Sequence, residues 1–327
     1  MSSDFFRGTP IIKGHGLYVR LPLAERLRAA KGVRQAVVKV RSFGHGVKGV
    51  RKSMDYISRA GTLPLETESG TIITGREELG DLVRDWAVDF DQRKDSRDSA
   101  HIIFSMPPGS DPEALRRAVR AVGARAFRGH EWVFAIHQDK NHPHAHMVLK
   151  MRSREQDLKL DFKKTDLHRL REIFAQAARE QGVQLAASPR AARGVGRKAA
   201  HHSFYYLRSK GIEPDMEKKE INEAGRELLR GDWSEKPWEK AMANRNELER
   251  KAYWQEAAAL REAAAKQTIE AERDRLWQEA RLLESFAQSM PTPRSRRQAF
   301  KERVLRGFEM RRQEERRANE RENDFER

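Results

Sequence analysis

Apolar and polar residues alternate in several short segments of the first two thirds of the chain, which is typical of half-buried β-strands. These segments are AVVKVRS at 36–42, HIIFSM at 101–106, EWVFAIH at 131–137 and HAHMVLKMR at 144–152. Apolar residues recur at helical spacing in four further segments, at about 50–60, 76–92, 112–127 and 164–182. The pattern therefore predicts elements in the order β–α–α–β–α–β–β–α.

Short turns between these segments indicate how the strands pair. A polar loop, QDKNHP, separates the strands at 131–137 and 144–152, so we expect an antiparallel hairpin there. A glycine-rich turn at 43–49 follows the first strand, and Gly61 ends the first helix. We therefore predict an α+β fold: a central antiparallel sheet with flanking helices on one of its faces.

From about residue 215 the strand pattern disappears, and Ala, Glu, Arg, Leu and Gln dominate. This composition predicts one or two long helices, which Pro291 and Pro293 interrupt. Beyond residue 300 the charges alternate in sign, which is typical of a solvated helix or a disordered tail. The predicted organisation is an N-terminal segment at 1–35, a sheet domain at 36–200 and a helical, charged region at 201–327.

The basic residues are unevenly distributed. Residues 1–210 contain 39 Lys and Arg against 23 Asp and Glu, whereas residues 211–327 contain 26 of each class. The whole formal charge of +16 thus belongs to the first part, which favours a polyanionic partner such as nucleic acid. The alternative is a basic protein whose charge only keeps it soluble.

Composition also excludes some chemistry. The 327 residues include no Cys, which rules out disulfides, a thiol nucleophile and thiolate zinc sites. No apolar run is long enough for a membrane span, and the first residues lack the order of a secretory signal. We therefore expect a cytoplasmic protein without membrane insertion.

Four histidines fall within ten residues, in HQDKNHPHAH. His144 and His146 are two apart on a predicted strand, so alternation puts both on one face of the sheet. His137 ends the preceding strand, and the hairpin brings it alongside them. Three neutral nitrogens arranged in this way can hold a divalent metal and leave positions open for substrate. The alternative is a histidine-rich loop that binds nothing.

Two neighbours of these histidines have less defined roles. Asp139 can accept a hydrogen bond from a metal ligand and fix its tautomer, or it can be an ordinary turn residue. His142 precedes Pro143 in the loop, and we expect it to contact solvent or DNA.

Of the five tyrosines, Tyr56 is the candidate nucleophile for attack on a phosphate. It lies in RKSMDYISRAG, near Arg51, Lys52 and Arg59, and such cations stabilise a phenolate and bind phosphate. Packing of a helix tyrosine against the sheet is an equal alternative. Tyr205 and Tyr206, in HHSFYYL, are predicted to form an aromatic packing cluster.

Four segments resemble, in the right order, the motifs of conjugative relaxases. They are VVKVRSFGHGVKGVRKSMDYISRAG, AHIIFSMPPGSDPEAL, VFAIHQDKNHPHAHMVLK and SPRAARGVGRK. The chain is similar to the MobP class, most closely to relaxases that cut T-DNA borders, within the histidine–hydrophobic–histidine endonucleases. The H-x-D-x4-H-x-H element is specific to this superfamily. The resemblance extends from about 36 to 198.

The resemblance implies roles for individual residues. His137, His144 and His146 hold the metal, Tyr56 is the nucleophile that cuts one DNA strand at a transfer origin, and Asp139 is a base or an orienting group. Ser105 lies near the substrate. The further residues expected to contact DNA are Arg51, Lys52, Arg59, His142, Arg190, Arg193, Arg197 and Lys198.

The implied reaction gives a 5′-phosphotyrosyl bond and a free 3′-hydroxyl, after which the protein pilots the single strand in conjugation. Imidazole ligands favour Mn, Co, Ni or Zn over Mg in affinity, and Mg or Mn is the expected ion by abundance. Implied partners are origin DNA, accessory relaxosome proteins and a type IV coupling protein, with export into a recipient cell. The alternatives are a rolling-circle replication initiator and a non-catalytic DNA-binding protein.

Overall fold

The computed structural model describes residues 21–91, 93, 95–153, 159–195 and 202–325. Its internal contacts divide the chain into two compact units, Met1–Ser188 and Pro189–Arg327. The predicted domain boundary at 200 falls outside the described residues and stays a prediction. In the described part of the chain, none of the helices is both long and apolar enough to span a membrane.

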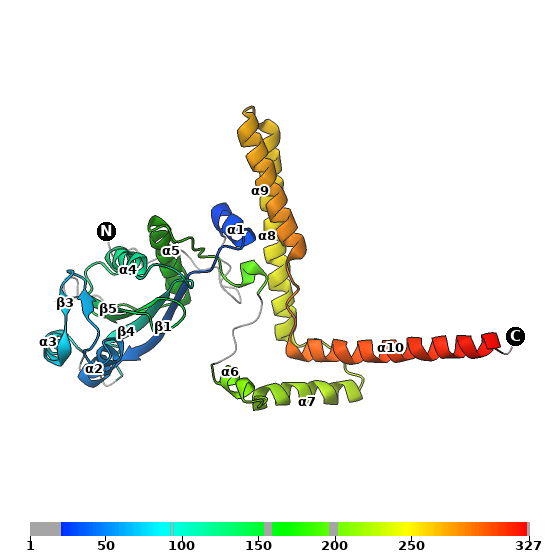
Figure 1. Cartoon of the computed structure of the whole chain (residues 1–327), viewed down its shortest axis with the longest axis horizontal. Helices are drawn as coiled ribbons and strands as arrows, with labels where there is room; N and C mark the ends of the chain where they lie inside the picture. The colour runs from blue at the N-terminus through cyan, green and yellow to red at the C-terminus, as the bar shows by residue number, and fades with distance from the viewer. Residues whose placement is uncertain (1–20, 92, 94, 154–158, 196–201, 326–327) are drawn as a thin grey trace. The chain divides into compact units, whose positions relative to one another are not determined.

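The first unit is built on one six-stranded sheet (Figure 1). Its strands are β1 (Val37–Gly44), β2 (Leu65–Thr67), β3 (Ile72–Ile73), β4 (Ser99–Ser105), β5 (Trp132–His137) and β6 (His144–Lys150). They lie in the order β1-β4-β6-β5-β2-β3, and all neighbours are antiparallel. The predicted antiparallel sheet and its β5–β6 hairpin are confirmed. The two short strands β2 and β3 were not expected from the sequence pattern.

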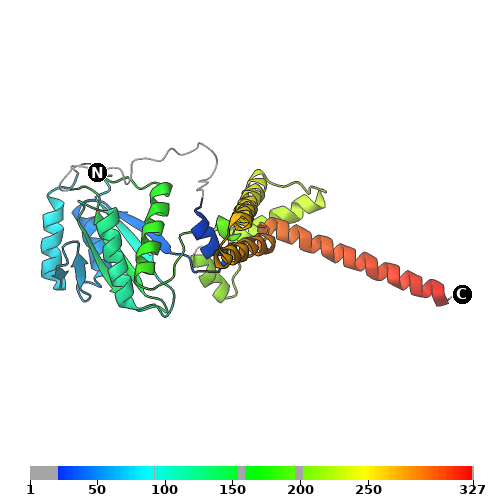
Figure 2. The ribbon, with the colours of Figure 1, turned by 90° about the horizontal axis from the view of Figure 1, so that it is seen from above.

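The described residues of this unit form five helices: α1 (Leu23–Ala30), α2 (Gly46–Ile57), α3 (Gly75–Ala87), α4 (Pro112–Ala126) and α5 (Lys164–Glu180). The prediction that helices cover one face of the sheet is wrong, because α4 and α5 pack on one face and α2 and α3 on the other (Figures 1 and 2). Helix α1 also lies in the N-terminal segment, which was expected to be loosely structured.

The two faces of the sheet have different side chains because successive residues of a strand point to opposite sides. On β4, Ala100, Ile102 and Phe104 are fully buried in the core against α4 and α5. The alternate residues of β4 face the side of α2 and α3. Helices α2 and α3 cover only part of that side, with a smaller core that includes Val133 and Val148. The uncovered part carries the polar residues described below.

A close backbone contact fixes the start of α2. A Cβ atom on Gly44 would lie 3.1 Å from the backbone of Gly49, and one on Gly49 would lie 3.2 Å from Gly44. Only glycine allows this approach without displacement of the backbone. The glycine-rich turn thus folds α2 directly back onto the sheet. Val50, Met54 and Ile57 form the buried side of the helix.

The second unit is helical, as predicted. It contains a short 3₁₀ turn (Ala191–Arg193) and α6 (His202–Ser209), α7 (Asp215–Leu229), α8 (Pro237–Lys266), α9 (Glu270–Ser289) and α10 (Arg296–Phe325). The prolines 291 and 293 separate α9 from α10, as expected. The predicted packing cluster at Tyr205 and Tyr206 is wrong, since these side chains are 55% and 54% exposed. Among the tyrosines that the structure describes, Tyr253 is the buried one, and its hydroxyl donates to the carbonyl of Ala192.

Candidate active site

Strand register brings residues from four strands into rows on the open face of the sheet. His137 of β5 lies opposite His144 of β6, which lies opposite Ser105 of β4. In the next row, Lys39 of β1 lies opposite Ile103, which lies opposite His146. Alternation and the hairpin therefore place the histidines together, as the sequence predicted.

His137, His144 and His146 form a compact cluster. One nitrogen from each ring lies within 4.8 Å of those from the other two, and all three side chains are buried. The ring centroids of His137 and His146 are 4.5 Å apart. Such a set of ring nitrogens can hold a divalent metal.

One nitrogen of each ring lies within hydrogen-bond distance of a neighbouring group. These contacts test whether the cluster fits a metal. Nε2 of His137 lies 2.8 Å from the carbonyl of Ile57, and Nδ1 of His144 lies 3.3 Å from the carbonyl of His142. Nδ1 of His146 lies 2.8 Å from Nε2 of His101. Each ring can thus be oriented by one nitrogen while the other remains as a ligand, the usual arrangement of metal-binding histidines. The residues present fit the metal.

Burial favours the neutral state of His144 and His146, which is the state that binds metal. It is the largest cause of the lowered pKa of His144, and it also lowers the pKa of His146 to about 2. The pKa of His101 falls to about 4, first through burial and then through the positive charge of Arg41.

Tyr56 lies next to this cluster. It is the penultimate residue of α2, and its ring stands edge-on to His146 with centroids 5.5 Å apart. Its side chain is 48% exposed, in contrast to the buried Met54 and Ile57 of the same helix. Ile57, whose carbonyl contacts Nε2 of His137, follows Tyr56 directly in the sequence. The C-terminal end of α2 therefore contacts one of the candidate metal ligands.

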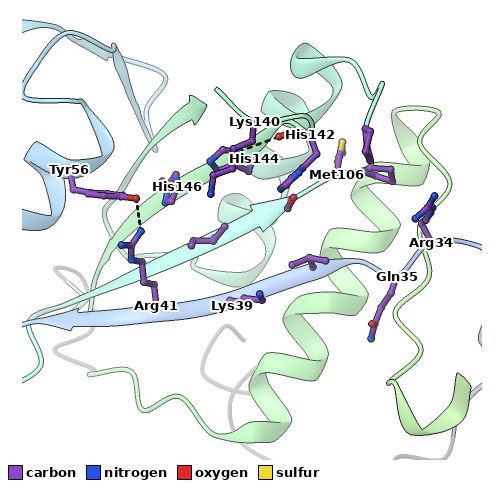
Figure 3. Close-up of a pocket in the computed structure, with 15 residues that line it drawn as sticks. Arg34, Gln35, Lys39, Arg41, Tyr56, Met106, Lys140, His142, His144 and His146 are labelled. Carbon is purple, nitrogen blue, oxygen red and sulfur yellow. Dashed lines mark hydrogen bonds between the residues drawn. The ribbon is translucent and has the colours of Figure 1, made fainter. Parts of the chain in front are cut away.

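Arg41 is the cation that contacts Tyr56, and the sequence analysis missed it. Its Nη1 donates to the phenolic oxygen at 2.6 Å, and its guanidinium lies 4.3 Å from the ring centroid (Figure 3). The register of β1 against β4 shifts between Val40 and Ser42, and such bulges redirect side chains. The signal available in the sequence was the alternation of Val37, Lys39 and Arg41 along one face of the strand.

The basic residues expected around Tyr56 have other partners. Arg51 pairs with Asp55 at 3.0 Å, and Arg59 pairs with Asp139 at 2.7 Å. The hydrogen bond from Arg59 is also the main cause of the lowered pKa of Asp139. Lys52 is exposed. Arg51 and Arg59 are thus both paired with carboxylates, and their expected contact with DNA stays a prediction.

Asp139 does not orient a metal ligand by a hydrogen bond. Its Oδ1 lies 3.8 Å from Nε2 of His144, which is too long for one. The groups within hydrogen-bond distance of the three histidines are two backbone carbonyls and His101. Arg59 and Ala60 both have positive φ, 51° and 57°, in the turn after α2. The Arg59–Asp139 pair ties this strained turn to the loop between β5 and β6.

An open pocket of about 540 Å³ extends from Tyr56 past the histidines (Figure 3). Ser105 and His142, both expected near the substrate, line it together with His144 and His146. Its other lining residues are mainly basic or apolar: Arg34, Gln35, Val37, Lys39, Arg41, Ile103, Met106, Pro107, Pro108 and Lys140. Cations beside apolar surface suit a nucleotide strand, whose phosphates are charged and whose bases stack.

Four further residues were expected to contact DNA. Arg190 and Arg193 belong to the second unit. Arg197 and Lys198 lie outside the described residues. Their role in binding DNA stays a prediction.

Comparisons with known proteins agree with this geometry. Residues 73–183 match the model of the family Relaxase, described as MobA/VirD2-like, nuclease domain. This region includes His101, Ser105 and the three clustered histidines but not Tyr56. The position of Tyr56 beside His146 is thus an independent observation.

Three T-DNA border endonucleases VirD2 are similar in sequence. The protein of Rhizobium radiobacter is 27% identical over 219 residues, 59% of this chain and 51% of the relative. That of Agrobacterium fabrum (strain C58 / ATCC 33970) is 26% identical over 185 residues, 50% of this chain and 41% of the relative. That of Rhizobium rhizogenes is 27% identical over 175 residues, 46% of this chain and 40% of the relative.

The chain spans about half the length, or less, of these curated relatives. A solved structure described as "Molecular Basis of Vancomycin Resistance Transfer in Staphylococcus aureus" is 16% identical with a TM-score of 0.33, over 47% of this chain and 99% of that one. This likeness is too weak to carry an argument. The matched family model and the VirD2 relatives do carry one: together with the three-histidine cluster they show that residues 73–183 are similar to a MobA/VirD2-like relaxase nuclease domain, with distant similarity to the T-DNA border endonuclease VirD2.

Proposed function

We propose that this protein is a metal-dependent DNA strand transferase. It nicks one strand at a transfer origin and remains joined to the 5′ end through Tyr56. The observation that carries the proposal is the edge-on contact of an exposed tyrosine with His146, one of three histidines that fit a divalent metal. A protein that only binds DNA has no need of a tyrosine in this position.

His137, His144 and His146 would hold the metal, which supplies Lewis-acid chemistry that draws negative charge from a bound phosphate. Arg41 adds a fixed positive charge at the phenolic oxygen. Lys39 and Lys140 line the same pocket and attract the backbone of a single strand. Ser105 offers a hydroxyl to a phosphate oxygen or a base.

The nucleophile is the phenolic oxygen of Tyr56. Its proton leaves to solvent, which reaches this half-exposed side chain, and the guanidinium of Arg41 stabilises the phenolate that forms. The oxygen forms a bond to phosphorus while the bond from phosphorus to the 3′-oxygen breaks. The electron pair goes to the 3′-oxygen, which takes a proton from water.

The phosphotyrosyl bond conserves the phosphodiester, so a 3′-hydroxyl can attack it later and reclose the strand. Water as nucleophile would lose this possibility. Export of the piloted strand, accessory proteins and a coupling protein belong to the same proposal and rest on the family alone.

A test is available without knowledge of the origin sequence. The full chain is incubated with Mn²⁺ and a pool of 3′-end-labelled single-stranded oligonucleotides of random sequence, and the products are separated on a denaturing gel. We expect a covalent protein–DNA adduct that chelator prevents. Sequencing of the trapped strands then gives the preferred nick site.

Two matched variants define the result. Tyr56→Phe keeps the ring and should form no adduct, whereas Tyr205→Phe changes an exposed tyrosine of the second unit and should behave like the wild type. An adduct that persists in Tyr56→Phe, or in excess chelator, contradicts the proposal. Strand cleavage without any covalent adduct contradicts it as well.

A further inference from the structure

His101 is a fourth imidazole at the site, and it lies outside the H-x-D-x4-H-x-H element. It belongs to β4, is 3% exposed, and its Nε2 lies 2.8 Å from Nδ1 of His146. The two ring centroids are 5.0 Å apart. Strand pairing between β4 and β6, and not proximity in sequence, brings them together.

A hydrogen bond between two neutral imidazoles requires one N–H and one lone pair. If His101 donates, then His146 accepts at Nδ1 and carries its own proton on Nε2, where it cannot bind a metal. If His146 donates from Nδ1, then its Nε2 has a free lone pair. A metal held by Nε2 therefore requires His101 to be the acceptor, with its own proton on Nδ1.

We propose that His101 is a positioning residue that accepts the Nδ1–H of His146 and so fixes the metal-binding tautomer of that ligand. The inference rests on the proposed function for its metal. Metal-binding histidines commonly use a carboxylate or a backbone carbonyl for this purpose. Here the acceptor is a neutral ring, which adds no negative charge to the site.

The other two ligands differ from His146 in this respect. His137 and His144 are engaged by the backbone carbonyls of Ile57 and His142. Substitution leaves a backbone carbonyl in place, so His146 is the ligand of the three whose orienting partner a single mutation removes. Variants of His101 can therefore separate an effect on the orientation of His146 from an effect on the packing of the sheet.

The experiment measures Co²⁺ affinity of the full, DNA-free chain by visible absorption. The variants are His101→Leu, which cannot accept a hydrogen bond, His101→Gln, whose amide oxygen replaces Nε2, and His101→Glu, which supplies a carboxylate. We expect the dissociation constant to rise 10- to 100-fold in the Leu variant. It should stay near the wild-type value in the Gln variant and fall below it in the Glu variant.

His130→Gln is the matched control. His130 is also buried in the first unit, and its Nδ1 contacts the carbonyl of Lys150, at the opposite end of β6 from His144. It should leave Co²⁺ affinity unchanged. Circular dichroism and the melting temperature in chelator show which variants are folded.

A role in packing alone predicts the reverse order, because Leu is tolerated best in a buried position and Glu worst. Wild-type affinity in a folded Leu variant overturns the proposal. Where the Leu variant does not fold, weaker binding in the Glu variant than in the Gln variant overturns it. The adduct assay on the wild type tests the proposed function separately. If the wild type binds Co²⁺ but forms no adduct, the nicking reaction is contradicted and the role of His101 is not. If the wild type binds no Co²⁺, both proposals are contradicted.

Discussion

The two units of this chain bury polar side chains in opposite ways. In the first unit, four buried imidazoles lie together beside an open pocket, and one nitrogen of each of the three clustered rings could bind a metal. In the second unit, Arg297 is 3% exposed and pairs with Glu227 and Glu239 on neighbouring helices. Lys301 joins the same cluster through Glu227 at 2.9 Å.

The difference indicates what each group does. Buried ions that satisfy one another specify how helices pack, because a misplaced helix leaves a charge unpaired. Apolar side chains of similar size would pack about as well as buried neutral imidazoles. Packing alone therefore does not explain rings whose ligand nitrogens are unused. We interpret the first arrangement as a site for chemistry and the second as a structural element.

The largest expected effect is that of Tyr56→Phe. Removal of one oxygen eliminates the nucleophile and keeps the ring against His146, so the adduct should disappear while single-stranded DNA still binds. Fluorescence anisotropy with a labelled oligonucleotide measures the binding. Loss of binding together with loss of the adduct would instead assign Tyr56 a role in docking.

The double change of His144 and His146 to Ala should abolish both metal binding and adduct formation. Two lost imidazoles leave one protein nitrogen, which is too few for a stable site. Metal content is measured by calorimetric titration with Mn²⁺. The wild type in excess chelator should reproduce the loss of the adduct, and retention of either activity would argue against the metal.

Arg297→Met should destabilise the second unit by about 3 kcal/mol, since it removes the cation paired with the buried Glu239, whereas Glu227 keeps Lys301. Adduct formation should remain, provided that the assay is run well below the unfolding transition. Arg294→Met is the control, because Arg294 is exposed and paired with Glu302, where such pairs contribute about 0–1 kcal/mol. Denaturant unfolding measures both. Equal effects would remove the contrast between buried and exposed pairs.

Acid should destabilise the metal-free first unit through its histidines. The pKa of His101 in the folded state, about 4, lies below its ordinary value of 6.5, so the folded state binds fewer protons than the unfolded state between these values. The contribution of the neutral ring to the free energy of unfolding is fully present above pH 6.5 and is lost as the pH falls toward 4. Melting temperatures in chelator should drop over this range, and less steeply in His101→Gln. Parallel curves for the two proteins would contradict the assignment.

The smallest effect concerns the rim of the pocket. Lys39→Gln should weaken single-stranded DNA binding and lower the salt slope by about 0.7, the value for one phosphate contact. Lys240→Gln removes the same charge from the second unit and should leave the slope unchanged. Affinities measured over a range of salt concentrations give both slopes, and identical changes would mean that the pocket has no special part in binding.

The sequence predicted those features that depend on local pattern. Alternation in HAHMVLK and the short loop before it were enough to place three histidines on one face. Helix spacing predicted α2 to α5 and the helical second unit. The glycines at 43–49 predicted a turn after the first strand.

It did not predict features that depend on the order of strands. Strand β4 lies between β1 and β6, and this places His101 beside His146 and Arg41 beside Tyr56. No local pattern contains that order. Proximity in sequence also did not show the partners of Arg51 and Arg59, because helix geometry and the turn after α2 direct them to Asp55 and Asp139.

The most direct measurement locates the covalent bond. The adduct formed with Mn²⁺ and the oligonucleotide pool is digested with nuclease and trypsin, and the peptides are identified by mass spectrometry. We predict a nucleotide attached through phosphate to Tyr56 and absent when chelator is added before the DNA. A nucleotide on another residue, or an adduct at Tyr56 that forms equally without metal, would contradict a metal-assisted tyrosine nucleophile at this site.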